Sequence, residues 1–111
     1  MSEERKGSWT FLSNHAHVLV CLARDPDARL RDIADAVGIT ERAVCRIVAE
    51  LEESGVITRI REGRRNHYEI DPTRTLRHRL ESSRDVGSLL SMLLDPAEAR
   101  RLGLRGRRRV S

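Results

Sequence analysis

Two segments with helical periodicity, residues 31–37 and 41–54, are separated by only Gly38-Ile39-Thr40. Glycine readily takes the left-handed conformation that follows the end of a helix, and threonine is a good cap for the start of the next one. A connection this short holds two helices at a steep angle, as in a helix-turn-helix unit. The turn therefore restricts the chain to folds in which the second of these helices keeps one face exposed.

A helix before this unit and a hairpin after it complete the predicted pattern. Residues 14–24 carry apolar side chains at helical spacing behind Ser13, a good N-cap, and Asp25-Pro26-Asp27 ends that helix. Residues 28–30 are predicted to form a very short strand. The β-branched residues of 56–61 and the return strand 67–70 flank a turn rich in Gly, Arg and Asn, which indicates a β-hairpin.

The expected fold class is therefore mainly α with a small β-hairpin: a winged helix-turn-helix with a C-terminal dimerisation helix. A further helix is predicted over about residues 73–94, and the arginine- and glycine-rich end is predicted to be disordered. The chain divides into an N-terminal arm (1–12), the winged helix-turn-helix domain (13–71), a C-terminal helical region (72–95) and a basic tail (96–111).

The net charge of +4 is unevenly distributed along the chain. Residues 1–99 hold all 17 acidic residues but only 15 basic ones, whereas six arginines lie from Arg100 onward. Only local clusters of arginine therefore bear on nucleic-acid binding. No apolar run approaches the roughly 20 residues that span a bilayer, and the two cysteines lack CxxC spacing. A cytoplasmic protein without a membrane segment is expected.

Local clusters of arginine do occur, on the second helix of the unit and at the tip of the hairpin. Arg42 and Arg46 lie one turn apart, opposite the apolar stripe, where they can reach bases or phosphates in a major groove. The hairpin tip carries charge suited to phosphates or a minor groove. The predicted DNA-binding residues are Thr40, Glu41, Arg42, Cys45, Arg46 and Ala49 on the helix and Arg61, Arg64, Arg65 and Asn66 on the hairpin.

Asp32-Ile33-Ala34, Gly38-Ile39-Thr40 and residues 46–57 (RIVAELEESGVI) resemble bacterial winged-helix regulators of the MarR, ArsR and Lrp/AsnC type. The resemblance covers about residues 13–71. It implies a dimeric, DNA-binding transcriptional regulator with the third helix as its recognition helix. Three features of these families are not expected in this chain: the effector domain of Lrp-like proteins, the long leading helix of MarR proteins and the cysteine-rich metal motif of ArsR sensors. A small-molecule effector therefore stays unidentified.

A homodimer is expected, because a single short recognition helix gains affinity when two copies bind half-sites about one DNA turn apart. Apolar residues before the first helix and after the hairpin are assigned to its interface. The alternative for the C-terminal cluster is packing on the core of its own chain. The predicted dimerisation residues are Trp9, Phe11, Leu12, Val86, Leu89, Leu90, Leu93 and Leu94.

No metal site is assigned, and no cofactor is expected. His17 and Cys21 lie at i and i+4, with His15 nearby, but a complete metal site needs more ligands than these. Structural or dimer-interface roles are favoured for them. Cys45 lies on the exposed side of the recognition helix, where its oxidation would affect DNA binding. This redox role is kept as an alternative.

An enzyme is not expected, because the sequence shows no nucleophile–base pair, no phosphate-binding glycine loop and no carboxylate cluster in a plausible pocket. The competing function is a winged-helix module that contacts protein or RNA. Such a module would have only the non-specific DNA affinity of its basic tail. Arginines on both expected contact elements favour a transcriptional regulator that binds specific sequences in double-stranded DNA.

Overall fold

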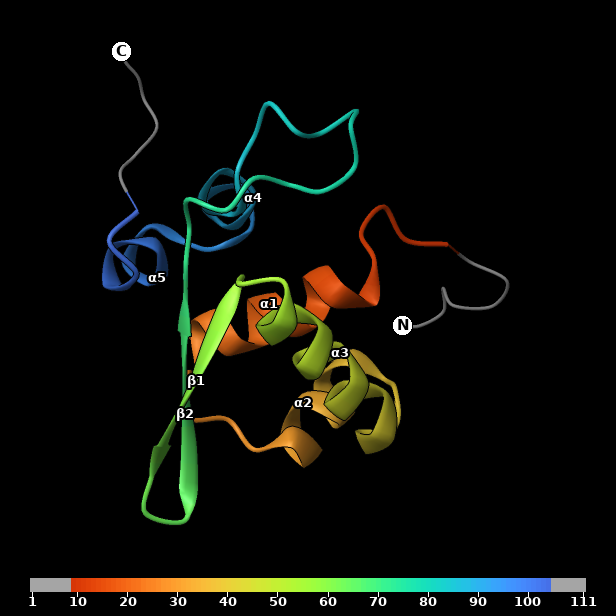
Figure 1. Cartoon of the computed structure of the whole chain (residues 1–111), viewed down its shortest axis with the longest axis vertical. Helices are drawn as coiled ribbons and strands as arrows, with labels where there is room; N and C mark the ends of the chain where they lie inside the picture. The colour runs from red at the N-terminus through yellow and green to blue at the C-terminus, as the bar shows by residue number, and fades with distance from the viewer. Residues whose placement is uncertain (1–8, 105–111) are drawn as a thin grey trace.

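A computed structural model describes residues 9–104. The hairpin projects away from the helices, and α4 and α5 lie at the opposite end of the molecule from the hairpin turn (Figure 1). This arrangement confirms the predicted fold class, mainly α with a β-hairpin. The elements are α1 (Asn14–Arg24), α2 (Leu30–Val37), α3 (Glu41–Glu53), β1 (Ile57–Glu62), β2 (Arg65–Ile70), α4 (Val86–Leu93) and α5 (Pro96–Arg101).

Side-chain caps mark the starts of α1 and α3, and a glycine marks the end of α2. The Ser13 hydroxyl accepts a hydrogen bond from the backbone N–H of Ala16 at the start of α1. The Thr40 hydroxyl accepts one from the N–H of Ala43, at 3.0 Å, at the start of α3. Between α2 and α3, Gly38 has a φ of +87°, a conformation that most other residues adopt only with strain. The predicted helix-turn-helix connection is thus present.

The core joins the three N-terminal helices to the hairpin and to α4. Leu22 of α1, Ile33 of α2, Ile47 of α3 and Leu90 of α4 are almost completely buried. Leu90 belongs to the same apolar cluster as the other three, so α4 is part of this core. The remaining buried apolar residues are Val18, Leu19, Ala23, Ala34, Val44, Val48, Leu51, Val56, Ile57, Tyr68, Val86 and Leu94.

The hairpin is antiparallel, and its last pair before the turn is Glu62 with Arg65. The free edge of β2 contacts the connection between α1 and α2, because the backbone N–H of Tyr68 donates to the carbonyl of Pro26 at 2.9 Å. The strand predicted for residues 28–30 does not form: Arg29 is the N-cap of α2, and Leu30 is its first residue. The chain enters α2 immediately after its contact with β2.

The C-terminal region differs from the prediction in two places. Residues 73–85 form turns and bends, and the helix begins only at Val86, behind the N-cap Asp85. The earlier segment has few apolar side chains to bury, and a short helix without a buried face is marginal in water. Residues 96–101 form α5 where a disordered tail was predicted, because Asp95 and Glu98 form a capping box. The predicted tail residues 105–111 lie outside the described part.

No helix within residues 9–104 combines the length and the apolar character needed to cross a membrane.

Asp71 stabilises the exit from the hairpin, and its effect should depend on pH. Its carboxylate accepts hydrogen bonds from the N–H and the hydroxyl of Thr73, at 3.0 and 2.6 Å. These hydrogen bonds hold the pKa of Asp71 below its usual value. A carboxyl group with a lowered pKa in the folded state stabilises that state above the unfolded pKa, and this contribution is lost as pH falls through the folded pKa.

We expect Asp71→Asn to lower the melting temperature at neutral pH, with the difference from the parent protein shrinking as the pH is lowered through the aspartate range. Thermal unfolding followed by circular dichroism at several pH values measures both trends. Thr73→Val removes the hydroxyl donor and should show the same pattern to a smaller extent. A difference in melting temperature that is constant from neutral to acidic pH would contradict this role for Asp71.

Candidate nucleic-acid interface

The exposed side of α3 carries the helix residues that were predicted to bind DNA. Its opposite side is buried in the core through Val44, Ile47, Val48 and Leu51, which fixes the helix on the domain. Thr40 and the five predicted residues of α3 itself are all exposed. The structure therefore brings the DNA-binding residues predicted for the helix to a single surface: Thr40, Glu41, Arg42, Cys45, Arg46 and Ala49.

Arg46 belongs to a small polar network that connects α3 to α1. A guanidinium nitrogen of Arg46 lies 3.7 Å from a carboxylate oxygen of Glu50, and His15 Nε2 lies 2.7 Å from the same oxygen. The hydrogen bond with His15 holds the pKa of Glu50 below its usual value. The Arg46 side chain remains 61% exposed. It is therefore accessible to a ligand, although Glu50 is held by His15.

The glutamates at the end of α3 are a potential obstacle to DNA, and two of them have basic partners. Glu50 contacts His15 and Arg46 as described above. Glu52 lies 3.4 Å from a guanidinium nitrogen of Arg59 on β1. This second pair also connects the end of α3 to the base of the hairpin. The negative charge at the end of α3 is therefore partly compensated within the domain.

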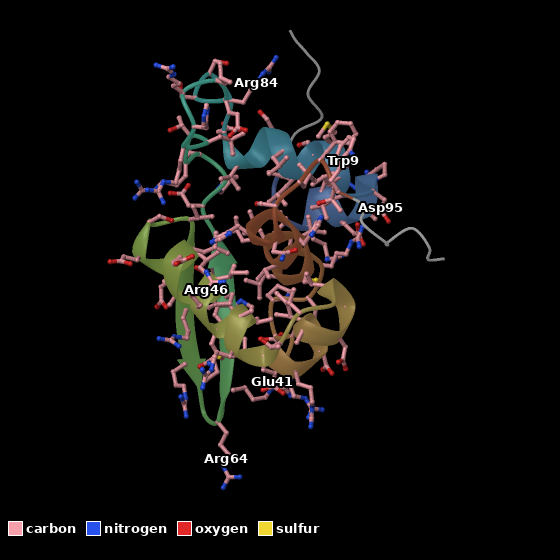
Figure 2. All side chains as sticks on the ribbon, turned by 90° about the vertical axis from the view of Figure 1, so that its right-hand side faces the viewer. Trp9, Glu41, Arg46, Arg64, Arg84 and Asp95 are labelled. Atoms are coloured by element: carbon pink, nitrogen blue, oxygen red, sulfur yellow. The ribbon has the colours of Figure 1, made fainter. Side chains whose placement is uncertain are left out.

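The hairpin presents the predicted arginines at its tip. Arg64 points away from the body of the protein (Figure 2), and Arg61, Arg64 and Arg65 are all exposed. The Nε–H of Arg61 donates to the carbonyl of Gly63 at 2.9 Å, which keeps that side chain close to the turn. Asn66 is only half-buried, but its Oδ1 is buried without a hydrogen-bond partner among the described residues.

An open cleft of about 390 Å³ separates the hairpin from the start of α2. Arg29, Arg64 and Arg65 line it together. Arg29 is the N-cap of α2, and the unpaired backbone amides of a helix N-terminus favour bound anions. Asp27 also lines the cleft, but its three arginines outnumber that carboxylate, which makes the cleft a candidate site for a DNA phosphate. The sequence contained a signal for Arg29, its place before a helix, but the strand predicted for residues 28–30 obscured it.

His67 fixes β2 of the hairpin to the α1–α2 connection. Its Nδ1 lies 2.9 Å from a carboxylate oxygen of Asp27. This hydrogen bond is the main reason that the pKa of His67 is raised above its usual value. Together with the contact between Tyr68 and Pro26, it positions the hairpin relative to α2.

The predicted dimerisation residues divide into two groups. Trp9 and Phe11 are 73% and 91% exposed and form an edge-to-face pair with ring centroids 4.9 Å apart. Leu12, Leu89 and Leu93 are half-buried. Val86, Leu90 and Leu94 are buried in the chain's own core, which corrects their assignment to an intermolecular interface. An apolar stripe on a helix does not reveal whether the surface that covers it belongs to the same chain.

A groove of about 1240 Å³ lies between the N-terminal arm, α1, the end of α3 and residues 75–89. Phe11, His15, Glu50 and Leu89 are among its lining residues. Glu50, Leu51 and Glu53 of α3 line the groove, and Glu50 also contacts Arg46, so the groove adjoins the exposed side of α3.

The histidines and cysteines considered for a metal site or a redox role each have different neighbours in the structure. His17 hydrogen-bonds with Asn14 at 3.2 Å, and His15 with Glu50. Cys21 is half-buried, and burial raises the pKa of its thiol, which keeps it protonated. Cys45 is an exposed free thiol on the outer side of α3.

Residues 13–64, just under half of the chain, match the model of the MarR family. The matched segment contains α1, α2, α3 and the hairpin through its turn. A riboflavin kinase of Thermococcus kodakarensis is 46% identical over 43 residues, which cover 39% of this chain and 20% of the kinase. A fifth of that enzyme is too little to assign its activity to this protein. No solved structure is similar enough to count as a match.

Proposed function

We propose that this protein, whose residues 13–64 form a MarR-type winged helix-turn-helix domain, regulates transcription by binding specific sequences in double-stranded DNA as a homodimer. The observation that carries the proposal is the exposure of arginines on both contact elements, α3 and the hairpin. Glu41 at the start of α3 and Arg64 at the hairpin tip lie toward the same end of the molecule (Figure 2). One DNA duplex can therefore contact both elements.

In the proposed complex, α3 enters the major groove, where Arg42 and Arg46 reach base edges. Arg64 and Arg65 at the hairpin tip contact the flanking backbone, and the cleft beside Arg29 holds a phosphate. These backbone contacts position the protein, whereas the contacts of α3 select the sequence. The complex forms on chromosomal DNA in the cytoplasm, where promoter occupancy blocks or recruits polymerase.

A second copy of the chain is proposed to bind through the exposed Trp9–Phe11 pair and the half-buried Leu89 and Leu93. A monomer seldom leaves large aromatic side chains this exposed next to further apolar surface. Two copies would place two α3 helices in successive major grooves.

Fluorescence anisotropy with labelled DNA tests the proposed function. The full chain and residues 1–104 are each titrated into DNA from upstream of the protein's own gene and into a scrambled duplex, at two salt concentrations. Leu104 is the appropriate boundary because it packs against the core, and the cut removes four arginines. A preference of residues 1–104 for one duplex, or for sites enriched from random DNA, supports a sequence-reading domain. Binding that disappears with the tail would favour the protein- or RNA-contact alternative.

Replacing both Arg64 and Arg65 with alanine should weaken binding to all DNA sequences by a similar factor. Each lost phosphate contact is expected to reduce the slope of log affinity against log salt by about 0.9. Anisotropy titrations over a range of salt concentrations measure both effects. The double variant Arg79→Ala/Arg84→Ala is the matched control, because it removes the same charge from two exposed residues of the segment between β2 and α4. Arg84 lies at the opposite end of the molecule from Arg64 (Figure 2). Equal losses in the two double variants would exclude a specific role for the hairpin.

A further inference from the structure

Three potential metal ligands from separate parts of the chain meet at the side of the hairpin. Asp27 lies in the α1–α2 connection, Glu62 at the end of β1 and His67 on β2. One ligand atom of each residue lies within 4.8 Å of the other two. Glu62 pairs with Arg65, two residues before His67, so alternation along the strands places Glu62 and His67 on the same face.

The backbone brings the third residue to this face. The N–H of Tyr68 donates to the carbonyl of Pro26, which holds Asp27 beside β2. Its carboxylate oxygen lies 2.9 Å from His67 Nδ1, and its own carbonyl accepts a hydrogen bond from Arg65 at 3.3 Å. The three ligands are thus held by a hairpin and a docked connection, both fixed by backbone hydrogen bonds.

The charges around this cluster favour a cation. Among residues 9–104, neither the Asp27 nor the Glu62 carboxylate forms an ion pair with an arginine or a lysine. Arg65 donates to the backbone carbonyl of Asp27 and not to its carboxylate. The two carboxylates therefore converge on His67, and within residues 9–104 no arginine or lysine is paired to either of them. A divalent cation bound between the two carboxylates would balance their negative charge.

We propose that Asp27, Glu62 and His67 form a binding site for a divalent transition-metal ion with the ligand preferences of zinc. One imidazole nitrogen and two carboxylate oxygens are a donor set that zinc accepts, with water completing the coordination. Ligand atoms around a tetrahedral zinc ion are about 3.4 Å apart, given metal–ligand bonds of about 2.1 Å. The ligand atoms here lie within 4.8 Å of one another. Small side-chain rotations can bring them to the spacing that zinc needs, because Asp27 and Glu62 are exposed and His67 is partly exposed.

An ion at this site would link the α1–α2 connection to both strands of the hairpin. It would also neutralise two negative charges next to Arg65, one of the residues proposed to contact phosphate. The site is separate from the α3 surface, and its existence does not depend on the proposed DNA-binding function.

Isothermal titration calorimetry of the untagged full chain with zinc chloride, without DNA, tests the site. The parent protein should bind zinc, and Glu62→Gln and His67→Gln should each reduce the affinity at least about tenfold. Glu69→Gln is the matched control, because residue 69 lies on the same face of β2, and its affinity should be unchanged. Cys45→Ser should also bind as the parent does, which separates this site from the exposed thiol.

Glu62→Gln keeps the test decisive if His67→Gln fails to fold, because Glu62 is exposed and its side chain has no hydrogen bond within residues 9–104 that the change would remove. Absence of zinc binding by the parent protein would overturn the proposal. Binding by Glu62→Gln with the affinity of the parent would overturn it as well. Since the titration contains no DNA, either failure leaves the proposed regulatory function untouched.

Discussion

Replacing Arg42 and Arg46 together with alanine is expected to abolish most of the protein's discrimination between its operator and a scrambled duplex. Both side chains are exposed on the side of α3 that faces away from the core. A bidentate contact between an arginine and a guanine contributes about 1–3 kcal/mol of discrimination against the wrong base. Loss of both contacts should therefore reduce the ratio of specific to non-specific affinity by about two orders of magnitude or more.

Non-specific affinity should fall much less, because Arg64, Arg65 and Arg29 remain in place. The single variants Arg42→Ala and Arg46→Ala separate the contributions of the two arginines to discrimination. Arg46 should contribute less, because it is paired with Glu50 in the free protein and breaking that pair offsets part of the free energy gained from DNA. Competition anisotropy with operator and scrambled DNA measures the ratio. Arg79→Ala/Arg84→Ala is again the control for total charge. Discrimination that survives in the Arg42→Ala/Arg46→Ala variant would mean that α3 does not read the sequence through these side chains.

Replacing Leu90 with alanine is expected to lower the free energy of unfolding by about 2–5 kcal/mol, the range for deletion of a buried leucine side chain. Leu90 is completely buried in the cluster that also contains Leu22 and Ile47. A loss of this size is a large fraction of the stability of a small domain. Urea denaturation followed by circular dichroism measures it. Met92→Ala on the same helix, where the side chain is 70% exposed, should change stability by less than about 0.5 kcal/mol.

The same experiment separates the two roles considered for α4. If Leu90 stabilises the core of its own chain, the loss should be independent of protein concentration. If it instead stabilised a dimer interface, the loss would change with concentration, because association contributes to the measured stability by mass action. Equal effects of Leu90→Ala and Met92→Ala would contradict the burial of Leu90.

The parts of the fold that could be predicted from sequence are those determined by local signals. Ser13 and Thr40 cap the helices that follow them, and Gly38 ends α2, so α1 and the helix-turn-helix unit agree closely with the prediction. The hairpin was recognisable because its residues alternate on both sides of a glycine-containing turn. The exposed side of α3 followed from its buried stripe. Each of these features depends on residues that are close together in the sequence.

The parts that could not be predicted depend on contacts between distant segments. Asp27 lies next to Glu62 and His67 only because its connection docks on the edge of β2, and no spacing in the sequence indicates this. Val86, Leu90 and Leu94 were recognised as apolar residues that need a covering surface, but that surface is the core of their own chain. The capping box of α5 is a local signal at Asp95 and Glu98. The arginine-rich composition that follows it is typical of a disordered tail and led to the opposite prediction.

The hydrogen bond between His15 and Glu50 has a consequence for how this chain can diverge. A change at His15 would free Glu50 to engage Arg46 more strongly, although His15 lies on α1. If α3 reads DNA as proposed, the sequence preference of the protein can therefore shift without any substitution in α3 itself. Two descendants of this chain with identical α3 sequences would then differ in the DNA they prefer, and a comparison of their α3 sequences alone would miss that difference.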